Sequence, residues 1–162
     1  MIEKEDVDAI VQKYDKHKLS IGTLGSHSAL NIFKGAKEEG FRTVCVLSKD
    51  REIVYRKFPV VDEMIYVNDF SELLDAKVQE KLRKLNTILV PHGSFNAYVS
   101  MEALLNDLQV PMLGNRKLLR WEIDRDMQRS WLQKSRLTLP KIYSSPDDID
   151  QLVIAKFPGA RG

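Results

Sequence analysis

The sequence predicts an α/β fold with a mainly parallel sheet. Short apolar runs, such as Thr87-Ile88-Leu89-Val90, alternate with segments that carry apolar residues at helical spacing. Nearly continuous apolar strands are typical of parallel sheets that are buried on both faces. Two of these runs end in a turn of glycine, serine and histidine that leads into a helix. Strands alternating with helices in this way favour a parallel sheet covered by helices on both faces.

The first half of the chain contains three of the expected strands. In chain order, the expected elements are a helix over residues 5–16, a strand over 19–24, a helix that Gly40 ends, and strands over 43–47 and 64–67. Asp69 stands three residues before Glu72, which is the spacing of a capping box. A helix is therefore expected from Asp69 to about Leu85.

The second half of the sequence predicts one more strongly apolar strand, and after it a segment rich in charged residues. The expected elements are a strand over residues 87–90, a helix over about 96–108, a brief strand over 110–113, a long helix over 115–136, a linker over 137–141 and a last strand that begins at Val153. Acidic and basic residues are interleaved along residues 115–136, which favours a solvated helix face braced by ion pairs. Trp121 and Trp131 are expected to pack within or between domains rather than stack on bases.

Composition excludes several classes of protein. The 162 residues are 43% hydrophobic and 30% charged, with a net charge of +2, so a globular chain without broad attraction to nucleic acid is expected. No apolar run approaches the roughly 20 residues that span a bilayer, and the amino terminus is amphipathic rather than a secretory segment. The single cysteine, Cys45, lies in an apolar run and is expected in the core. A cytoplasmic location is therefore expected.

Two turns have the position and the chemistry of a ligand site. Gly25-Ser26-His27-Ser28 and His92-Gly93-Ser94 each follow an apolar strand and precede a helix. In an open parallel sheet, ligands bind beyond the carboxyl ends of the strands, and a helix amino terminus favours a phosphate or another anion. The alternatives stay open, since the serines could simply cap their helices and His27 could be a solvated loop residue. His92 could point into the crevice or pack beneath it.

A third candidate lies at the end of the sequence. Lys156 follows an apolar run and precedes the glycine-containing turn through Gly162. A lysine beside a flexible loop with free backbone N–H groups is a typical grip for nucleotide phosphates. The predicted ATP-binding residues are Lys156, Pro158, Gly159, Ala160, Arg161 and Gly162.

Other site motifs are missing from the sequence. It has no G-x-G-x-x-G, no Walker A motif and no G-x-S-x-G elbow, which disfavours dinucleotide binding, P-loop chemistry and a hydrolase triad. Its three histidines and one cysteine lack zinc-site spacing. A metal would be magnesium accompanying a nucleotide.

Five runs, in order along the whole chain, carry a family resemblance. They are Thr23-Leu24-Gly25-Ser26-His27-Ser28, Val90-Pro91-His92-Gly93-Ser94-Phe95, Gly114-Asn115-Arg116, Leu119-Arg120-Trp121-Glu122 and Lys156-Phe157-Pro158-Gly159-Ala160-Arg161-Gly162. The sequence resembles the archaeal formate-dependent formaminoimidazole carboxamide ribonucleotide (FAICAR) synthetases, which are ATP-grasp ligases of purine biosynthesis. The resemblance implies the amino-terminal portion of such a ligase.

The resemblance also implies an activity and roles for particular residues. The family makes FAICAR from aminoimidazole carboxamide ribonucleotide (AICAR), formate and ATP, through formyl phosphate, and releases ADP and phosphate. By resemblance, His27 and Ser94 contact AICAR, and Lys156 begins the ATP-binding segment. No catalytic residue is assigned. The implied fold is a Rossmann-like preATP-grasp domain over residues 1–120, followed over residues 121–162 by a connecting helix and the start of an ATP-grasp domain.

Further expectations concern the partners of the chain and whether the chain is active by itself. The implied partners are small-molecule substrates and further copies of the chain in a homo-oligomer, with no nucleic acid or membrane. The magnesium ligands are expected beyond residue 162, so the chain alone is expected to bind ATP weakly and not to turn over. Two other functional classes stay open, a noncatalytic module that binds a ribonucleotide or sugar phosphate and an interaction protein that uses the Trp-bearing helix.

Overall fold

The computed structural model describes residues 2–155 and has two compact units, Met1–Arg116 and Lys117–Gly162. In chain order, the first unit contains α1 (Lys4–Val11), η1 (Lys16–Lys18), β1 (Ser20–Leu24), α2 (Ala29–Glu38), β2 (Arg42–Leu47), η2 (Lys49–Arg51), α3 (Glu52–Lys57), β3 (Glu63–Tyr66), η3 (Phe70–Leu74), α4 (Ala76–Lys84), β4 (Thr87–Leu89), α5 (Gly93–Tyr98) and α6 (Met101–Asn106). None of the helices within residues 2–155 is long and apolar enough to cross a membrane.

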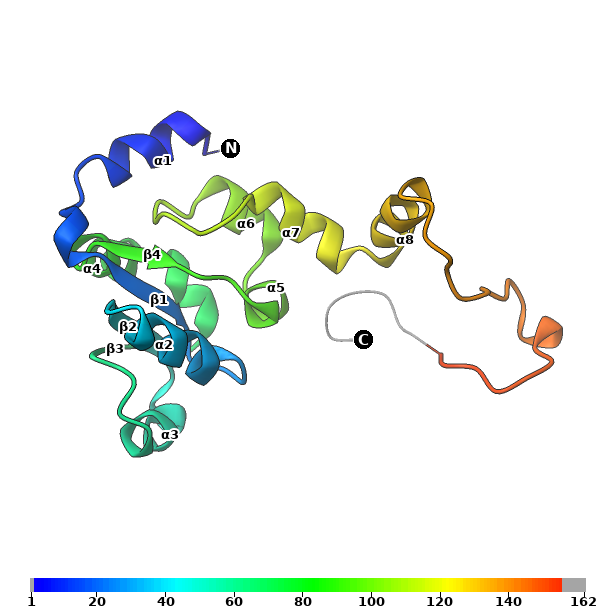
Figure 1. Cartoon of the computed structure of the whole chain (residues 1–162), viewed down its shortest axis with the longest axis horizontal. Coiled ribbons are helices and arrows are strands. Elements are labelled where there is room, and N and C mark those ends of the chain that lie inside the picture. Colours follow the sequence, from blue (N-terminus) through cyan, green and yellow to red (C-terminus); the bar gives the residue numbers. More distant parts are fainter. Residues whose placement is uncertain (1, 156–162) are drawn as a thin grey trace. The chain divides into compact units, whose positions relative to one another are not determined.

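The sheet of the first unit is parallel throughout, as predicted, and has the order β3-β2-β1-β4 (Figure 1). β1 is central, with Ser20 opposite Arg42 of β2 on one side and opposite Thr87 of β4 on the other. The chain steps outward from β1 to β2 and β3, and then crosses back to place β4 on the far side of β1. The crossover direction therefore reverses between β1 and β4, where an open parallel sheet binds its ligands.

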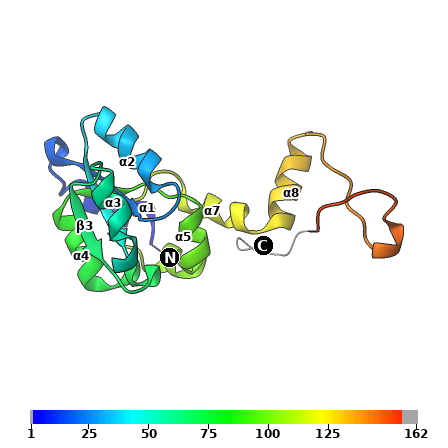
Figure 2. The same cartoon turned by 90° about the horizontal axis from the view of Figure 1, so that it is seen from below.

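Helices cover both faces of this sheet. Because parallel crossovers are right-handed, the change of direction after β3 places α4 on the face opposite α2, as Figure 2 shows. On the α2 face, Phe33 packs in a buried cluster with Cys45, Leu47 and Tyr55. Burial also raises the pKa of the Cys45 thiol, so the expected core role of Cys45 is confirmed.

Two helices predicted as continuous are broken in the first unit. The helix expected from Asp69 to Leu85 is instead η3 and α4, because Asp75 takes an extended conformation with ψ of 135°. Asp69 does cap η3, since its carboxylate accepts a hydrogen bond from the Ser71 N–H. The helix expected over 96–108 is likewise α5 and α6, which Val99 separates with ψ of 135°. The polar stretch near Asp50, for which no helix was predicted, forms η2 and α3.

The brief strand expected over residues 110–113 is reduced to one parallel bridge, between Leu89 and Met112. The Leu89 N–H donates to the Pro111 carbonyl at 2.8 Å, and the Leu113 N–H donates to the Leu89 carbonyl at 2.8 Å. Pro111 itself has no N–H to extend the ladder. This segment therefore lies beside β4 without lengthening the sheet.

The second unit begins one residue into α7 (Arg116–Ile123) and also contains α8 (Arg125–Lys134), η4 (Pro146–Asp148) and connecting segments. One long helix over 115–136 was the wrong prediction, because Asp124 is extended and caps α8 by accepting hydrogen bonds from the Asp126 and Met127 N–H groups. The Trp121 and Trp131 rings pack edge to face at 6.3 Å.

The strand expected from Val153 is also wrong for the residues described, which end at Ala155. They have no strand assignment, and Leu152 and Ile154 are 101% and 83% exposed. A strand needs a neighbour to accept and donate its backbone hydrogen bonds. The sheet of residues 2–155 includes none from this segment.

Candidate functional site

The turn after β1 is held against the buried part of β2. The Gly25 N–H donates to the Val46 carbonyl at 2.7 Å, so the backbone here lies close to the neighbouring strand. A Cβ atom at Gly25 would lie 2.8 Å from Leu47 Cβ and 2.9 Å from Cys45 Sγ. Only glycine therefore fits at this position without movement of its neighbours. The Tyr55 hydroxyl donates to the Ser26 carbonyl at 3.2 Å and fixes the next residue.

His92 organises the turn after β4. Its Nε2 lies 3.1 Å from the Leu24 carbonyl, and its Nδ1 accepts the Ser94 N–H at 3.3 Å. Since a carbonyl can only accept, these contacts assign the proton to Nε2. Burial lowers the pKa of His92 below its usual 6.5, which keeps the ring neutral and able to accept at Nδ1. Of the two possibilities left open for His92, the structure supports packing beneath the site.

The two turns meet through their serines. The Ser94 hydroxyl donates to the Ser26 Oγ at 2.7 Å, across 68 positions of sequence. Ser26 Oγ lies 3.3 Å from the Nδ1 of His27, and the His27 and His92 rings are 5.8 Å apart. A continuous polar path therefore runs from Ser94 through Ser26 to His27. It lies at the carboxyl ends of β1 and β4.

The residues of this site differ in solvent exposure. His27 is exposed, whereas Ser94 is 2% exposed and Ser26 is 9% exposed. His27 can therefore meet a ligand directly, and the Ser94 hydroxyl lies beneath it as the support of Ser26. The alternative that Ser94 caps α5 with its side chain is not what the structure shows, because the cap of α5 is His92. Ser28 precedes α2 but makes no side-chain cap hydrogen bond.

The electrostatics of this site suit an anion. Its five polar side chains, none of which is a carboxylate, are Ser26, His27, Ser28, His92 and Ser94. Among the first four backbone N–H groups of α2, a ten-residue helix, Ala29 donates to the Ser26 carbonyl at 3.0 Å and Ile32 to the Ser28 carbonyl at 3.3 Å, whereas those of Leu30 and Asn31 have no acceptor within the helix. The helix dipole adds partial positive charge at the same place. A phosphate group would meet hydroxyl, imidazole and amide donors there.

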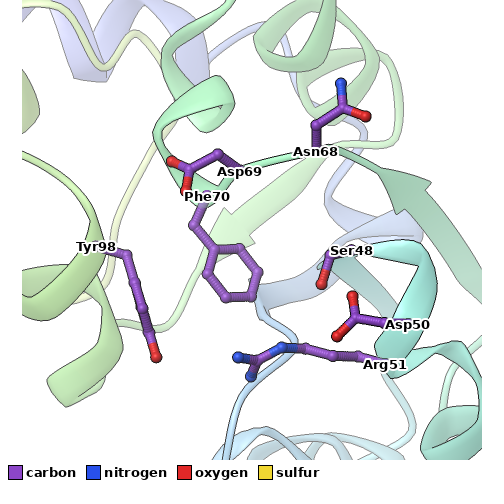
Figure 3. Close-up of a pocket in the computed structure, with 7 residues that line it drawn as sticks. All are labelled: Ser48, Asp50, Arg51, Asn68, Asp69, Phe70 and Tyr98. Carbon is purple, nitrogen blue, oxygen red and sulfur yellow. The ribbon is translucent and has the colours of Figure 1, made fainter.

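A pocket of about 250 Å³ lies along the same edge of the sheet, beyond β2 and β3 (Figure 3). It is lined by Ser48, Asp50, Arg51, Asn68, Asp69, Phe70 and Tyr98. Arg51 joins it to the site, because its guanidinium donates to the Gly25 carbonyl at 3.3 Å and lies 5.2 Å from the centre of the Phe70 ring.

A family model described as a protein of unknown function, DUF1246, matches residues 21–143, which is more than half of the chain. The chain belongs to this family. The matched residues include both turns of the site and the whole parallel sheet apart from Ser20.

Curated relatives of this DUF1246 chain carry one name in several archaea. The chain is 52% identical over 159 residues to the 5-formaminoimidazole-4-carboxamide-1-(beta)-D-ribofuranosyl 5'-monophosphate synthetase of Archaeoglobus fulgidus, covering 98% of the chain and 44% of the relative. It is 51% identical over 162 residues to the protein of that name in Methanocaldococcus jannaschii, covering 100% of the chain and 45% of the relative. The chain thus spans less than half the length of these relatives. The predicted resemblance to FAICAR synthetases is confirmed.

Solved structures show the same fold for this DUF1246 chain. An IMP biosynthesis protein PurP from Thermococcus kodakaraensis matches 80% of the chain and 41% of that protein, with a TM-score of 0.66 and 32% identity. An N5-carboxyaminoimidazole synthetase from Staphylococcus aureus, complexed with ADP, matches 72% of the chain and 30% of that protein, with a TM-score of 0.52 and 18% identity. The second likeness concerns the fold alone. The predicted α/β class is confirmed.

The sequence prediction named His27 and Ser94 and overlooked how they are connected. Ser26 is the bridge between the turns, and only its place in the Gly-Ser-His-Ser run could have indicated it. The predicted ATP-binding residues Lys156, Pro158, Gly159, Ala160, Arg161 and Gly162 lie outside the described residues. Within residues 2–155, no three His, Cys, Asp or Glu side chains gather to hold a metal ion.

Proposed function

We propose that this chain supplies the ribonucleotide site of an ATP-dependent ligase that formylates AICAR with formate to give FAICAR, ADP and phosphate. The relatives' name supplies the product of the reaction. The observation that carries the proposal is the hydrogen bond of 2.7 Å between Ser94 and Ser26, which joins the two anion-suited turns at the reversal point of the sheet. The AICAR phosphate is the anion that these turns would receive.

The chemistry of the proposed reaction requires activation of formate. Formate has a poor leaving group, so transfer of the γ-phosphoryl group of ATP to a formate oxygen gives formyl phosphate and ADP. The AICAR amine then attacks the formyl carbon, the C–O bond to phosphate breaks, and the nitrogen loses a proton. Such a reaction depends on positioning, on neutralised phosphate charge and on the exclusion of water from the mixed anhydride.

In this proposal the described residues bind and position AICAR. His27 contacts the ribonucleotide from the exposed edge, while Ser94 acts from below through Ser26. Neutral His92 holds the two turns together by bonding the Leu24 carbonyl and the Ser94 N–H. None of these side chains is assigned a covalent step.

The rest of the proposed machinery concerns residues outside the described part. ATP binding is assigned to Lys156 and to Pro158, Gly159, Ala160, Arg161 and Gly162, by the chemistry of a lysine beside a glycine turn. The ligands of the magnesium ion that would accompany ATP are likewise expected beyond residue 162. The proposed organisation is a preATP-grasp domain over residues 1–120 and the beginning of an ATP-grasp domain over 121–162, in a cytoplasmic homo-oligomer.

The test of this proposal is isothermal calorimetry with AICAR on the wild type and three variants. His27→Ala and Ser94→Ala should weaken AICAR binding about tenfold or more, because each removes a hydrogen bond that reaches the phosphate directly or through Ser26. His17→Ala is the matched control, since His17 is exposed in η1 and precedes the amino end of β1, whereas both turns follow the carboxyl ends of their strands. It should bind AICAR like the wild type.

Two results would count against the proposal. A wild-type chain without affinity for AICAR would contradict it, and so would equal binding by the His27→Ala and His17→Ala variants. The alternative of a noncatalytic module makes a different prediction. It expects AICAR binding that ATP and formate leave unchanged even in a polypeptide extended past Gly162.

A further inference from the structure

The pocket beyond β2 and β3 has no role in the binding scheme described so far. Figure 3 shows the Phe70 ring at its centre, with Ser48 and Asp50 on one side and Tyr98 on the other. The Asn68 side chain points away and bonds Glu72, its Nδ2 donating to the Glu72 Oε1 at 3.0 Å. The chemistry offered to a ligand therefore comes mainly from Ser48, Asp50 and Arg51.

Charge and burial limit what this pocket can hold. Its lining contains two carboxylates and one guanidinium, which disfavours a phosphate. Phe70 is 5% exposed, Arg51 lies over its ring, and Tyr98 packs against it at 5.2 Å. Little aromatic face is left for a flat heterocycle to stack on. The remaining chemistry, a hydroxyl and a carboxylate beside a small apolar surface, suits a polyhydroxylated ring.

Asp50 is the residue best placed to bind hydroxyl groups. It stands three positions after the last residue of β2 and forms no salt bridge within residues 2–155. A hydrogen bond from the Ser48 hydroxyl is the main cause that lowers the pKa of the Asp50 carboxyl, so the carboxylate is ionised at neutral pH. In doubly wound sheets that bind dinucleotides, an acidic residue about 20 positions after the phosphate-binding turn forms a hydrogen bond with a ribose hydroxyl. Asp50 lies at about this sequence separation from the turn of Ser26, His27 and Ser28.

The pocket adjoins the anion site through two of its lining residues, Arg51 and Tyr98. Arg51 touches the Gly25 carbonyl from one side. From the other side, Tyr98 and Ser94 lie on α5 only four residues apart, which is about 6 Å along a helix axis.

We propose that this pocket is a ribose subsite, in which the Asp50 carboxylate accepts hydrogen bonds from the 2'- and 3'-hydroxyls of a ribonucleotide whose phosphate lies at the turn of Ser26, His27 and Ser28. The inference rests on the proposed function, because it places the ribose of the same AICAR molecule. It adds a determinant of specificity for ribonucleotides over deoxyribonucleotides.

The test compares AICAR with its 2'-deoxy counterpart by calorimetry on the wild type, Asp50→Ala and Asp75→Ala. The wild type should bind AICAR about tenfold or more tightly than the deoxy compound, since a hydrogen bond to a charged acceptor is lost. Asp50→Ala should remove this preference by weakening AICAR binding alone. Asp75→Ala, an exposed aspartate of the same unit outside the pocket, should keep the preference.

The other outcomes distinguish a failure of the ribose subsite from a failure of the proposed function. If the wild type binds AICAR and Asp50→Ala keeps the full preference, or weakens both ligands equally, the ribose subsite is overturned while the proposed function stands. If the wild type binds neither compound, the proposed function fails and the subsite fails with it.

Discussion

Replacing Gly25 with alanine will destabilise the chain by about 1–3 kcal/mol and weaken AICAR binding tenfold or more. The added Cβ would lie 2.8 Å from Leu47 Cβ, 2.9 Å from Cys45 Sγ and 3.1 Å from Tyr55 Cε2. These neighbours belong to the buried cluster beneath α2, so they cannot move without a cost in packing. The turn must shift instead, and His27 shifts with it. Thermal unfolding followed by circular dichroism, with calorimetry for the ligand, measures both effects.

Gly35→Ala is the matched control for this substitution. Gly35 lies within α2, and a Cβ there meets nothing within 4 Å. Alanine favours a helix over glycine by roughly 0.5–1 kcal/mol, so the control should gain stability and keep its affinity. A Gly25→Ala variant as stable as Gly35→Ala would show that the turn is not packed against β2 as described.

The second large effect is expected for His92→Phe. Phenylalanine keeps the ring's approximate shape but leaves the Ser94 N–H without its partner. It also removes one of the two donors to the Leu24 carbonyl, which keeps the Ser26 N–H at 2.8 Å. An unsatisfied buried group costs about 1–3 kcal/mol, so the free energy of unfolding should fall by about that amount. Denaturant titration at pH 7 measures this loss. His17→Phe should change the stability little because His17 is exposed.

His92 also predicts a pH dependence of stability. Its pKa is lowered by burial in the folded state, so below the unfolded value of 6.5 the unfolded chain binds more protons than the folded chain. Its contribution to the free energy of unfolding is therefore complete above pH 6.5 and is lost as the pH falls through the folded pKa. The His92→Phe variant should have a flatter stability profile in this window. An unchanged profile would mean that His92 is not buried as a neutral ring.

Much of the fold could be predicted because its strands are short, apolar and separated by clear turns. Gly40, with φ of +80°, ends α2 where the sequence placed the end of a helix. The helix breaks at Asp75, Val99 and Asp124 could not be predicted from apolar spacing, since one extended residue leaves the pattern of apolar residues almost unchanged. At Asp124 the competing effect is local, because its carboxylate prefers to cap α8 over continuing α7.

The site was predicted in part for a similar reason. His27 and Ser94 stand in recognisable turns at strand ends, and parallel pairing brings such ends to one edge of the sheet. The pairing of Ser26 with Ser94 and the burial of Ser94 depend on the order β3-β2-β1-β4, which periodicity does not determine. The pocket at Asp50 and Arg51 draws residues from three separate segments, none of which has a motif of its own.

A crystal structure of the chain grown with AICAR would test most directly where the phosphate binds. We expect the AICAR phosphate against the turn of Ser26, His27 and Ser28, with the Ser94 hydroxyl still bonded to Ser26 beneath it. Ordered AICAR at any other place on the sheet, with this turn bound only to solvent, would contradict the account.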